Sequence, residues 1–196
     1  MMAATTPPSI SFEHAYRWHR KLRGIPRELL IASALRLELP ELDIELVDPE
    51  LQARTPEHIP DITVLKGSEL VAELEITGTD LAWQEMRLFK VFVLPSKVEY
   101  ARRRGQRYIY VYVNNGHLFS TREAWLLWLP GPDLVRAAEH ARTWTGRTVH
   151  GKIEKYYMIP RRKFKTSWHD LVAYIRYLAG ELAEPDPLAL ANFMAR

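Results

Sequence analysis

The chain of 196 residues is long enough for one domain with a substantial core, and its 47% apolar and 26% charged residues are typical of a soluble globular protein. It contains no cysteine, which excludes disulfides, thiolate metal sites and cysteine nucleophiles, and no apolar run approaches the length of a transmembrane helix. Residues 1–98 hold 11 Lys or Arg against 15 Asp or Glu, whereas residues 99–196 hold 16 against 9. An acidic half followed by a basic half suits a metal site that faces a polyanion.

The first part of the chain predicts a tail, two helices and a strand. Residues 1–10 lack the pattern of a secretory signal and are expected to form a flexible tail, so we expect a cytoplasmic protein. A helix over 12–23 is capped by Ser11, and a second helix begins at Pro26 and ends near Leu39. Alternating apolar and acidic residues predict a strand over 42–48, and residues 49–59 are expected to form a loop.

Residues 60–77 predict a β-hairpin that carries three carboxylates. Two apolar, β-branched runs flank a turn at Gly67. Glu73 and Glu75 share one face of the second strand because strand side chains repeat every two residues, and Asp61 opens the first strand. Like charges held close together raise each other's pKa, and burial raises it further. A hard divalent cation such as Mg²⁺, with Mn²⁺ as a substitute, would stabilise such a cluster. An alternative is that both glutamates lie on a solvated face of an edge strand.

The remaining elements complete a mixed β-sheet flanked by helices, which is an α/β fold. We expect a single domain over 11–184, with a core of about 26–113, a C-terminal elaboration of about 117–184 and a tail over 185–196. Residues 81–93 fit either a helix or a strand. The other expected elements are a helix over 96–104, a central strand over 107–113, an apolar segment over 123–129, a helix over 133–144, a loop over 145–152, a strand over 156–159, a basic loop over 161–165 and a helix over 168–183.

The order of helix, strand, Pro-Asp strand, Glu-x-Glu strand, helix and strand resembles the core of the PD-(D/E)xK, or restriction-endonuclease-like, nuclease superfamily. The resemblance spans residues 26–113 and rests on Pro60-Asp61 and Glu73-Leu74-Glu75. It implies a restriction-endonuclease-like core and a metal-dependent DNA endonuclease. Asp61, Glu73 and Glu75 would then be metal ligands, with Glu75 alternatively a base, and Glu28 on the upstream helix an auxiliary carboxylate.

One position departs from the family pattern, because Glu75 stands where a lysine is expected. Some members of the family carry Glu at this position, and others move the lysine to a neighbouring helix. Lys97 begins the helix that follows the Glu-x-Glu strand, so we predict that it replaces the missing lysine, with Lys90 as the second choice. Without such a lysine, the protein would bind metal and nucleic acid without cleaving.

Two basic clusters predict contacts with nucleic acid, because Lys and Arg bind phosphates and nearby aromatic rings can stack on exposed bases. The first ends the helix over 96–104. The second precedes the last helix, beside Tyr156, Tyr157 and Trp168. The predicted binding residues are Arg102, Arg103, Arg104, Arg161, Arg162, Lys163 and Lys165. The alternative for the first cluster is that it only complements the dipole of its helix.

The function predicted first is therefore a Mg²⁺-dependent endonuclease acting on double-stranded DNA, as a homodimer if both strands are cut, with no membrane partner. A second hypothesis is a non-catalytic nucleic-acid-binding protein that retains the nuclease fold. A third is a scaffold that binds another protein through its Trp-rich C-terminal half.

Overall fold

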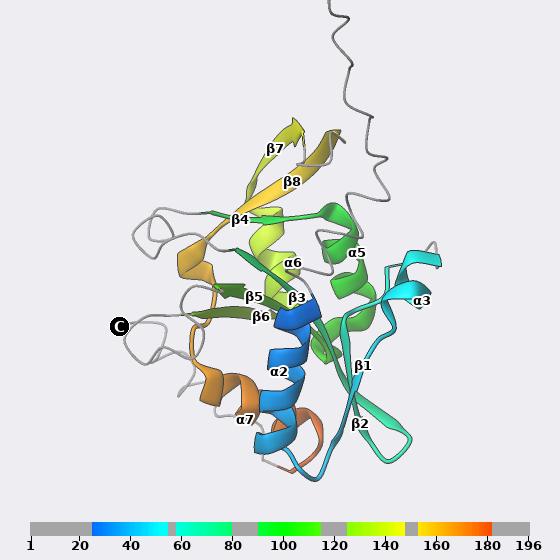
Figure 1. The fold of residues 1–196 in the computed structure, drawn as a ribbon. Coiled ribbons are helices and arrows are strands. Elements are labelled where there is room, and N and C mark those ends of the chain that lie inside the picture. Colours follow the sequence, from blue (N-terminus) through cyan, green and yellow to red (C-terminus); the bar gives the residue numbers. More distant parts are fainter. Residues whose placement is uncertain (1–24, 55–57, 80–89, 115–124, 148–152, 182–196) are drawn as a thin grey trace, which may run out of the picture.

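The computed structural model describes residues 25–54, 58–79, 90–114, 125–147 and 153–181. The predicted tails over 1–10 and 185–196, and the helix predicted over 12–23, lie outside these residues. Figure 1 shows two β-sheets with helices packed around them. The predicted α/β class, a mixed sheet flanked by helices, is confirmed. Among the helices of the described residues, none combines the length and the apolar character needed to cross a membrane.

The larger sheet has five strands in the order β1-β2-β3-β5-β6. β3 and β5 pair in parallel, and the other neighbours are antiparallel. The parallel pair lies at the centre, as the apolar sequence of β5 predicts. The strands are β1 (Asp43–Leu46), β2 (Ile62–Lys66), β3 (Glu69–Thr79), β5 (Tyr108–Asn114) and β6 (Leu126–Pro130).

Helices cover both faces of the larger sheet. α2 (Ile25–Glu38) and α7 (Trp168–Leu178) pack on one face through residues such as Ile31, Leu35 and Leu171. α5 (Pro95–Arg104) and α6 (Gly131–Glu139) share a second core with the tyrosines of β5. Since Leu74 and Ile76 point into the first core, the alternate residues Glu73 and Glu75 face the side of the sheet that α5 covers.

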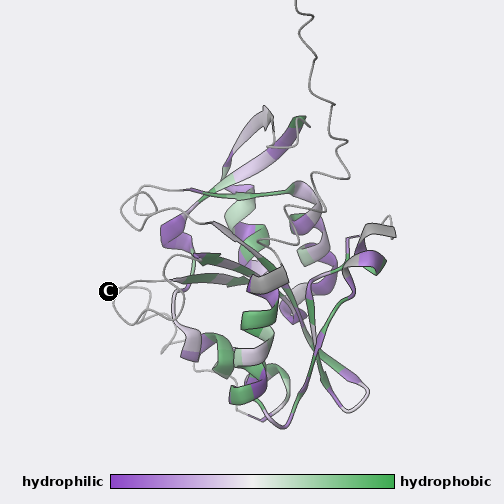
Figure 2. Cartoon of the chain, viewed as in Figure 1, coloured by the Kyte–Doolittle hydropathy of each residue, from purple (hydrophilic) through white to green (hydrophobic). Residues whose placement is uncertain are grey.

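The smaller sheet has three antiparallel strands in the order β4-β8-β7. They are β4 (Lys90–Val93), β8 (Ile153–Pro160) and β7 (Arg142–Arg147). Val91, Val93 and Ile159 are fully buried and attach this sheet to the core shared by α5 and α6. Figure 2 shows the contrast in hydropathy between the largely hydrophobic strands of the larger sheet and the more hydrophilic β7 and β8.

Several predicted elements are correct to within a few residues. The helices predicted from Pro26 and over 96–104 are α2 and α5, and the predicted hairpin is β2 with β3. Gly67 adopts a φ of 60°, as the tight turn between them requires. β3 runs on to Thr79, beyond its predicted end. Gly78 permits this because a Cβ there would lie 2.1 Å from the carbonyl oxygen of Val113 on β5.

Four predictions of local structure are wrong or incomplete. The loop predicted over 49–59 contains the helix α3 (Pro49–Arg54), whose start is stabilised by Asp48 accepting a hydrogen bond from the Glu50 amide at 2.8 Å. The helix predicted over 133–144 ends at Glu139, and β7 occupies 142–147 because Thr143, Trp144 and Thr145 favour a strand. The part of the ambiguous segment that the structure describes, residues 90–93, is a strand. The basic loop contains the short 3₁₀ helix η4 (Arg161–Lys163).

Candidate active site

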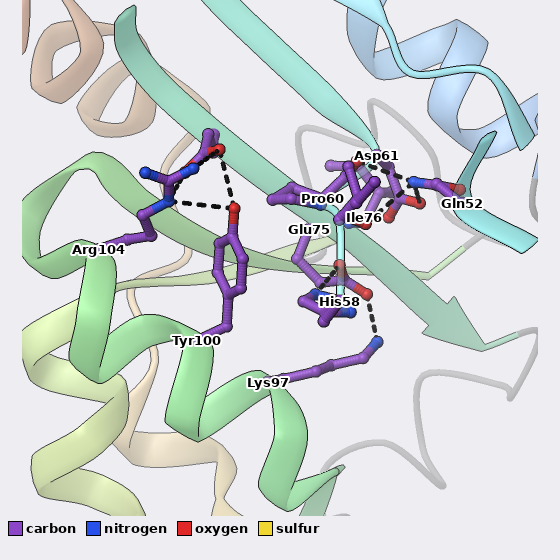
Figure 3. A network of polar contacts seen from close by, with 11 residues as sticks. Gln52, His58, Pro60, Asp61, Glu75, Ile76, Lys97, Tyr100 and Arg104 are labelled. Carbon is purple, nitrogen blue, oxygen red and sulfur yellow. Dashed lines mark hydrogen bonds and ion pairs between the residues drawn. The ribbon is translucent and has the colours of Figure 1, made fainter. Parts of the chain in front are cut away.

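Asp61 lies just before β2 and is fixed to the neighbouring strand β3. Its side chain is buried, with a relative exposure of 7%. Its backbone amide donates to the Leu74 carbonyl oxygen at 3.0 Å, and its Oδ2 accepts a hydrogen bond from the Ile76 amide at 2.7 Å. Gln52 on α3 donates to Asp61 Oδ1 at 3.3 Å. The Pro-Asp turn is therefore held by β3 and α3, and its carboxylate is directed to the Ile76 amide of β3 (Figure 3).

Glu75 lies in the middle of β3 and has two cationic or titratable partners. Lys97 Nζ contacts Glu75 Oε1 directly, and His58 Nε2 lies 2.9 Å from Glu75 Oε2. Lys97 occupies the first turn of α5, where Pro95 begins the helix, so its side chain reaches the strand from the start of that helix. Figure 3 shows Lys97 and His58 directed to the same carboxylate. Lys97, which the sequence predicted, is thus brought to Glu75, whereas Lys90 is exposed at the start of β4 in the smaller sheet.

The carboxyl groups of Asp61 and Glu75 have opposite pKa shifts. Burial raises the pKa of Asp61 well above its ordinary value, and the negative charges of Glu75 and Glu28 raise it further, against the attraction of Lys97. Burial also acts to raise the pKa of Glu75, but the charge of Lys97 and the contacts with His58 outweigh it and lower that pKa to about 2. Asp61 is therefore a carboxylate whose surroundings disfavour its charged form, whereas those of Glu75 favour it.

Glu28 comes from a distant part of the sequence and also joins this group. It lies in the first turn of α2, where a negative charge complements the helix dipole, and its side chain is 5% exposed. Its charge contributes to the raised pKa of Asp61, which indicates that the two carboxylates are close enough to interact. A surface glutamate in a first turn would be exposed, so the burial of Glu28 shows that it is not the ordinary dipole-stabilising residue.

Glu73 lies apart from the group formed by Glu28, Asp61, Glu75 and Lys97. Its Oε1 accepts hydrogen bonds from the Tyr100 hydroxyl at 2.9 Å and from Arg104 Nη2 at 3.1 Å, and its Oε2 lies 2.9 Å from Arg104 Nε. The reason is that α5 lies along the sheet, so that its first turn reaches Glu75 and its last turn reaches Glu73. Seven residues of helix separate Lys97 from Arg104, a rise of about 10 Å.

Both glutamates are buried on a central strand, at 6% for Glu73 and 4% for Glu75. The alternative in which they lie on the solvated face of an edge strand is therefore wrong. The expected convergence of Asp61, Glu73 and Glu75 on one metal ion is also not seen. In the part of the chain that the structure describes, no three His, Cys, Asp or Glu side chains are arranged to hold a metal ion.

The chemistry of the donors nevertheless fits a hard cation. Glu28, Asp61 and Glu75 offer carboxylate oxygens, which are the ligands that Mg²⁺ prefers, and a cation would offset the charge that raises the pKa of Asp61. The fully buried hydroxyl of Tyr108 has no hydrogen-bond partner within the described residues. Burial raises the pKa of Tyr108, and the charges of Glu75 and Asp61 add to the effect, so this hydroxyl faces the same group. A water molecule on a cation there would give it a partner.

No protein-family model and no curated protein matches the sequence. Among solved structures, the chain is similar to Hjc, a Holliday junction resolvase from the hyperthermophilic archaeon Archaeoglobus fulgidus. The identity is 12% and the TM-score is 0.39, over 74% of this chain and 98% of that one. At this level of similarity, the assignment of a function depends on the residues of this chain.

The first predicted basic cluster is largely engaged within the protein. Arg102 pairs with Glu99 at 2.7 Å, Arg104 pairs with Glu73, and the guanidinium of Arg103 lies 5.6 Å from the centre of the Tyr100 ring. The structure thus gives Arg104 a role in holding Glu73 to α5. All three residues are exposed to solvent in part, so contacts of Arg102 and Arg103 with phosphates remain a prediction.

The second predicted cluster is divided by the fold. Arg162 and Lys163 are exposed on η4, whereas Arg161 is half-buried. Lys165 lies over the Trp128 ring at 4.9 Å, and burial lowers its pKa. Of the aromatic residues expected beside this cluster, Tyr157 packs against the second core and Trp168 packs on Trp125 at 5.7 Å. Tyr156 lies on the outer side of the smaller sheet.

Three residues that position these carboxylates were not predicted from the sequence. His58 contacts Glu75, Gln52 contacts Asp61, and Tyr100 contacts Glu73. The signal for His58 was its place two residues before Pro60, on the approach to the Pro-Asp turn. Gln52 also donates to the carbonyl oxygens of Ile59 and Pro60, at 3.1 and 2.8 Å, so it orders this turn. No sequence pattern marked it, because the helix that carries it was predicted to be a loop.

Proposed function

We propose that this protein is a Mg²⁺-dependent DNA endonuclease whose active site is formed by Glu28, Asp61, Glu75 and Lys97. The observation that carries the proposal is that these four residues, from α2, the Pro-Asp turn, β3 and α5, interact beside the middle of β3: Lys97 contacts Glu75, and the charges of Glu28, Glu75 and Lys97 act on Asp61. The proposal differs from the expectation based on sequence in one residue, because Glu73 is assigned to the support of α5 and Glu75 takes its place as the second acidic residue.

The reaction would be hydrolysis of a phosphodiester bond. A water oxygen forms a bond to phosphorus, the bond to the leaving oxygen breaks, and the water gives up a proton while the leaving oxygen gains one. When bound, Mg²⁺ supplies the charge that activates the water and stabilises the leaving oxyanion. Asp61 and Glu75 would hold the cation, with Glu28 as an auxiliary carboxylate.

The protein's own residues have separate roles in this proposal. Glu75 stays ionised at neutral pH because Lys97 and His58 lower its pKa to about 2, so it is ready to act as a ligand. Lys97 supplies a positive charge beside the reacting phosphate, where negative charge develops. Gln52 and the Ile76 amide orient Asp61 through hydrogen bonds of 3.3 and 2.7 Å.

A second candidate is a nucleic-acid-binding protein that has this fold but does not cleave. It is favoured by the direct contact of Lys97 with Glu75 and by the lack of a formed three-ligand metal cluster among the residues that the structure describes. In that case Lys97 would neutralise Glu75 in place of a metal ion, and the group would serve stability alone.

Cleavage of supercoiled plasmid by the full chain distinguishes the two candidates. We expect nicked or linear product with Mg²⁺ or Mn²⁺ and none in EDTA, and we expect Asp61→Ala and Glu75→Ala to abolish it. Glu69→Gln is the matched control, because Glu69 lies on the same strand with an exposed side chain and only a long 3.6 Å contact to Arg107. Circular dichroism checks that each variant is folded. Cleavage that persists in both alanine variants would exclude the proposed site, whereas binding without cleavage by the wild type would favour the second candidate.

A further inference from the structure

The outer face of the smaller sheet carries a group of aromatic side chains. Direct pairing places Phe92 of β4 opposite Met158 of β8, and Trp144 of β7 opposite Tyr156 of β8. Directly paired residues, and residues two apart on a strand, lie on the same face of a sheet. The opposite face is the one buried through Val91, Val93 and Ile159. We call the set Phe92, Trp144, Tyr156 and Met158 the aromatic face.

The aromatic face is exposed and its rings support one another. Trp144 is 44% exposed, and Phe92, Tyr156 and Met158 are partly exposed. The Trp144 ring centre lies 5.5 Å from that of Phe92 and 6.0 Å from that of Tyr156. Phe92 and Tyr156 meet edge to face at 6.1 Å. Such contacts fix the orientation of the rings, which lowers the entropy cost of stacking a planar ligand on them.

Gly146 gives the Trp144 ring its position. A Cβ at Gly146 would lie 1.6 Å from Cη2 of Trp144 and 2.1 Å from its Cζ2, so the indole lies across the strand over this glycine. Only a residue without a side chain leaves this space. One side of the indole therefore rests on the β7 backbone, and the exposed part of the ring is directed to solvent.

The segments that form the smaller sheet and follow β8 are strongly positive. Residues 90–93, 142–146 and 153–165 contain seven Lys or Arg and one Asp or Glu, a formal net charge of +6. The acidic residue is Glu154, which accepts a hydrogen bond from the Tyr156 hydroxyl at 2.6 Å. Of the basic residues, Lys90 and Arg142 share the aromatic face by strand register, and Lys155 lies on the opposite face. The others follow β8 and are Arg161, Arg162, Lys163 and Lys165, of which Lys165 lies over the Trp128 ring. The whole chain has a net charge of only +3, so the surrounding positive charge is a property of this region.

Positive charge together with exposed aromatic rings indicates the kind of partner that this region would bind. A positive surface attracts phosphates, and exposed rings stack on bases that are not already stacked in a duplex. Double-stranded nucleic acid presents phosphates but hides the faces of its bases, so it would use only the charge. An acidic protein would likewise use the positive charge, but its binding would not require exposed rings held in fixed orientations. A single strand uses both features.

We propose that the aromatic face is a stacking platform for the unpaired bases of single-stranded DNA. The inference deepens the proposed function and rests on it for the choice of DNA. One residue, Leu94, connects β4 to α5, so Phe92 lies five positions before Lys97 in the chain. The end of β4 thus lies beside the start of the helix that supplies Lys97 (Figure 1). The substrate class implied is DNA with a single-stranded segment beside the bond that is cut.

Fluorescence anisotropy with a labelled oligodeoxythymidylate tests the platform in EDTA, where cleavage cannot occur. We expect Trp144→Ala to weaken binding of the single strand by roughly 10-fold or more, since one base stacked on an aromatic ring contributes about that much. Trp144→Phe keeps an aromatic ring and should restore most of the affinity. Ile153→Ala is the matched control, because Ile153 is an apolar residue of β8 that is 65% exposed but lies on the opposite face. It should bind like the wild type.

A duplex of matched length provides the second arm of the experiment. Trp144→Ala should change its affinity by less than about two-fold, because phosphate contacts are untouched. The platform would be overturned if Trp144→Ala left the affinity for the single strand unchanged. It would also be overturned if this variant weakened the binding of single strand and duplex equally. The outcome is separable from that of the proposed function. Loss of cleavage in Asp61→Ala, together with single-strand binding that depends on Trp144, supports both proposals. Single-strand binding that depends on Trp144 in a wild-type protein that never cleaves supports the platform alone.

Discussion

The two sheets of this protein display their functional groups in opposite ways. On the larger sheet, the carboxylates Glu28, Asp61 and Glu75 are buried, and Glu75 is neutralised by Lys97. On the smaller sheet, Trp144 is 44% exposed amid positive charge. A buried, charge-compensated group is suited to chemistry at a fixed point, because electrostatic interactions are strong where water is excluded. An exposed aromatic surface is suited to binding a flexible polymer.

The comparison implies that the larger sheet serves cleavage and the smaller sheet serves binding, which mutations can test. Changes in the carboxylate site should alter cleavage while leaving the affinity for DNA in EDTA nearly constant. Changes on the aromatic face should alter affinity while leaving the rate of cleavage of saturating substrate nearly constant. A residue that alters both to the same degree would show that the two regions act as one.

A large loss of cleavage is expected for Lys97→Ala. The loss of a positive charge that acts on the developing negative charge should reduce the cleavage rate by about 10²- to 10³-fold. Lys97→Arg keeps the charge with a different shape and should recover part of the rate. Cleavage measured under single-turnover conditions, with affinity measured in EDTA, gives both quantities. If Lys97→Ala weakens DNA affinity while the saturated rate stays constant, the lysine belongs to the binding surface.

Glu73→Gln tests whether Glu73 belongs to the support of α5. The substitution removes the negative charge that pairs with Arg104. Because the Arg104 side chain is partly exposed to solvent, the loss in the free energy of unfolding should be about 1 kcal/mol, which corresponds to a fall in Tm of about 2–4 °C. The cleavage rate per folded molecule should stay within about two-fold of the wild type, whereas Glu75→Gln should lose it. Thermal melts and cleavage assays at a temperature below both transitions provide the measurement. A Glu73→Gln protein of normal Tm but without cleavage would return Glu73 to the active site.

This difference between Glu73 and Glu75 explains where prediction from sequence stopped. The alternation along β3 placed both glutamates on one face, and the structure agrees. The choice between them depends on where α5 crosses that face, which is a matter of packing between distant segments. The sequence located Lys97 correctly because Pro95 marks the start of its helix, and a first turn beside the end of a strand leaves few places for a long side chain.

The smaller sheet was harder to predict because its strands come from separate parts of the chain. β4 lies some fifty residues before β7, and its pairing with β8 has no local signal. The helical pattern that begins at Asp133 also predicts a helix through Trp144. The β-branched pair Thr143 and Thr145 around Trp144 is the local feature that favours a strand there. The hairpin of β2 and β3 was predictable by contrast, since Gly67 marks its turn.

The pH dependence of stability provides a test of the buried carboxylates. The pKa of Asp61 is raised by burial and by Glu75 and Glu28, so the folded state binds the proton more tightly than the unfolded chain. Stability from this group is therefore lost as pH rises from about 4 through the raised pKa. Glu75 has the opposite sign. Its pKa is lowered to about 2, so its contribution is present above its unfolded value near 4.5 and is lost as pH falls towards 2.

Asp61→Asn removes the first of these effects. At neutral pH we expect a rise in Tm of a few degrees, equivalent to roughly 1 kcal/mol, because a buried carboxyl group whose charged form is disfavoured in the fold is replaced by a neutral amide. The gain should vanish below about pH 4, where Asp61 is protonated in both states. Thermal melts in EDTA across this pH range measure it, and Glu69→Gln should show no such trend. A fall in Tm at neutral pH would mean that the Asp61 charge stabilises the fold, and that the site is structural.

A small effect on single-strand affinity is expected for Gly146→Ala, which changes the position of the Trp144 ring without removing it. A Cβ at 1.6 Å from the indole cannot be accommodated, so the ring must leave its place over the strand. Single-strand affinity should fall by about three-fold, a part of what a stacked base contributes. Thr145→Ala is the control, since Thr145 is exposed on the opposite face. Trp144 fluorescence, taken as the difference between each protein and its Trp144→Phe counterpart, reports whether the ring has moved. A ring that moves while affinity stays constant would show that any exposed aromatic group suffices, and that Gly146 serves the strand and not the platform.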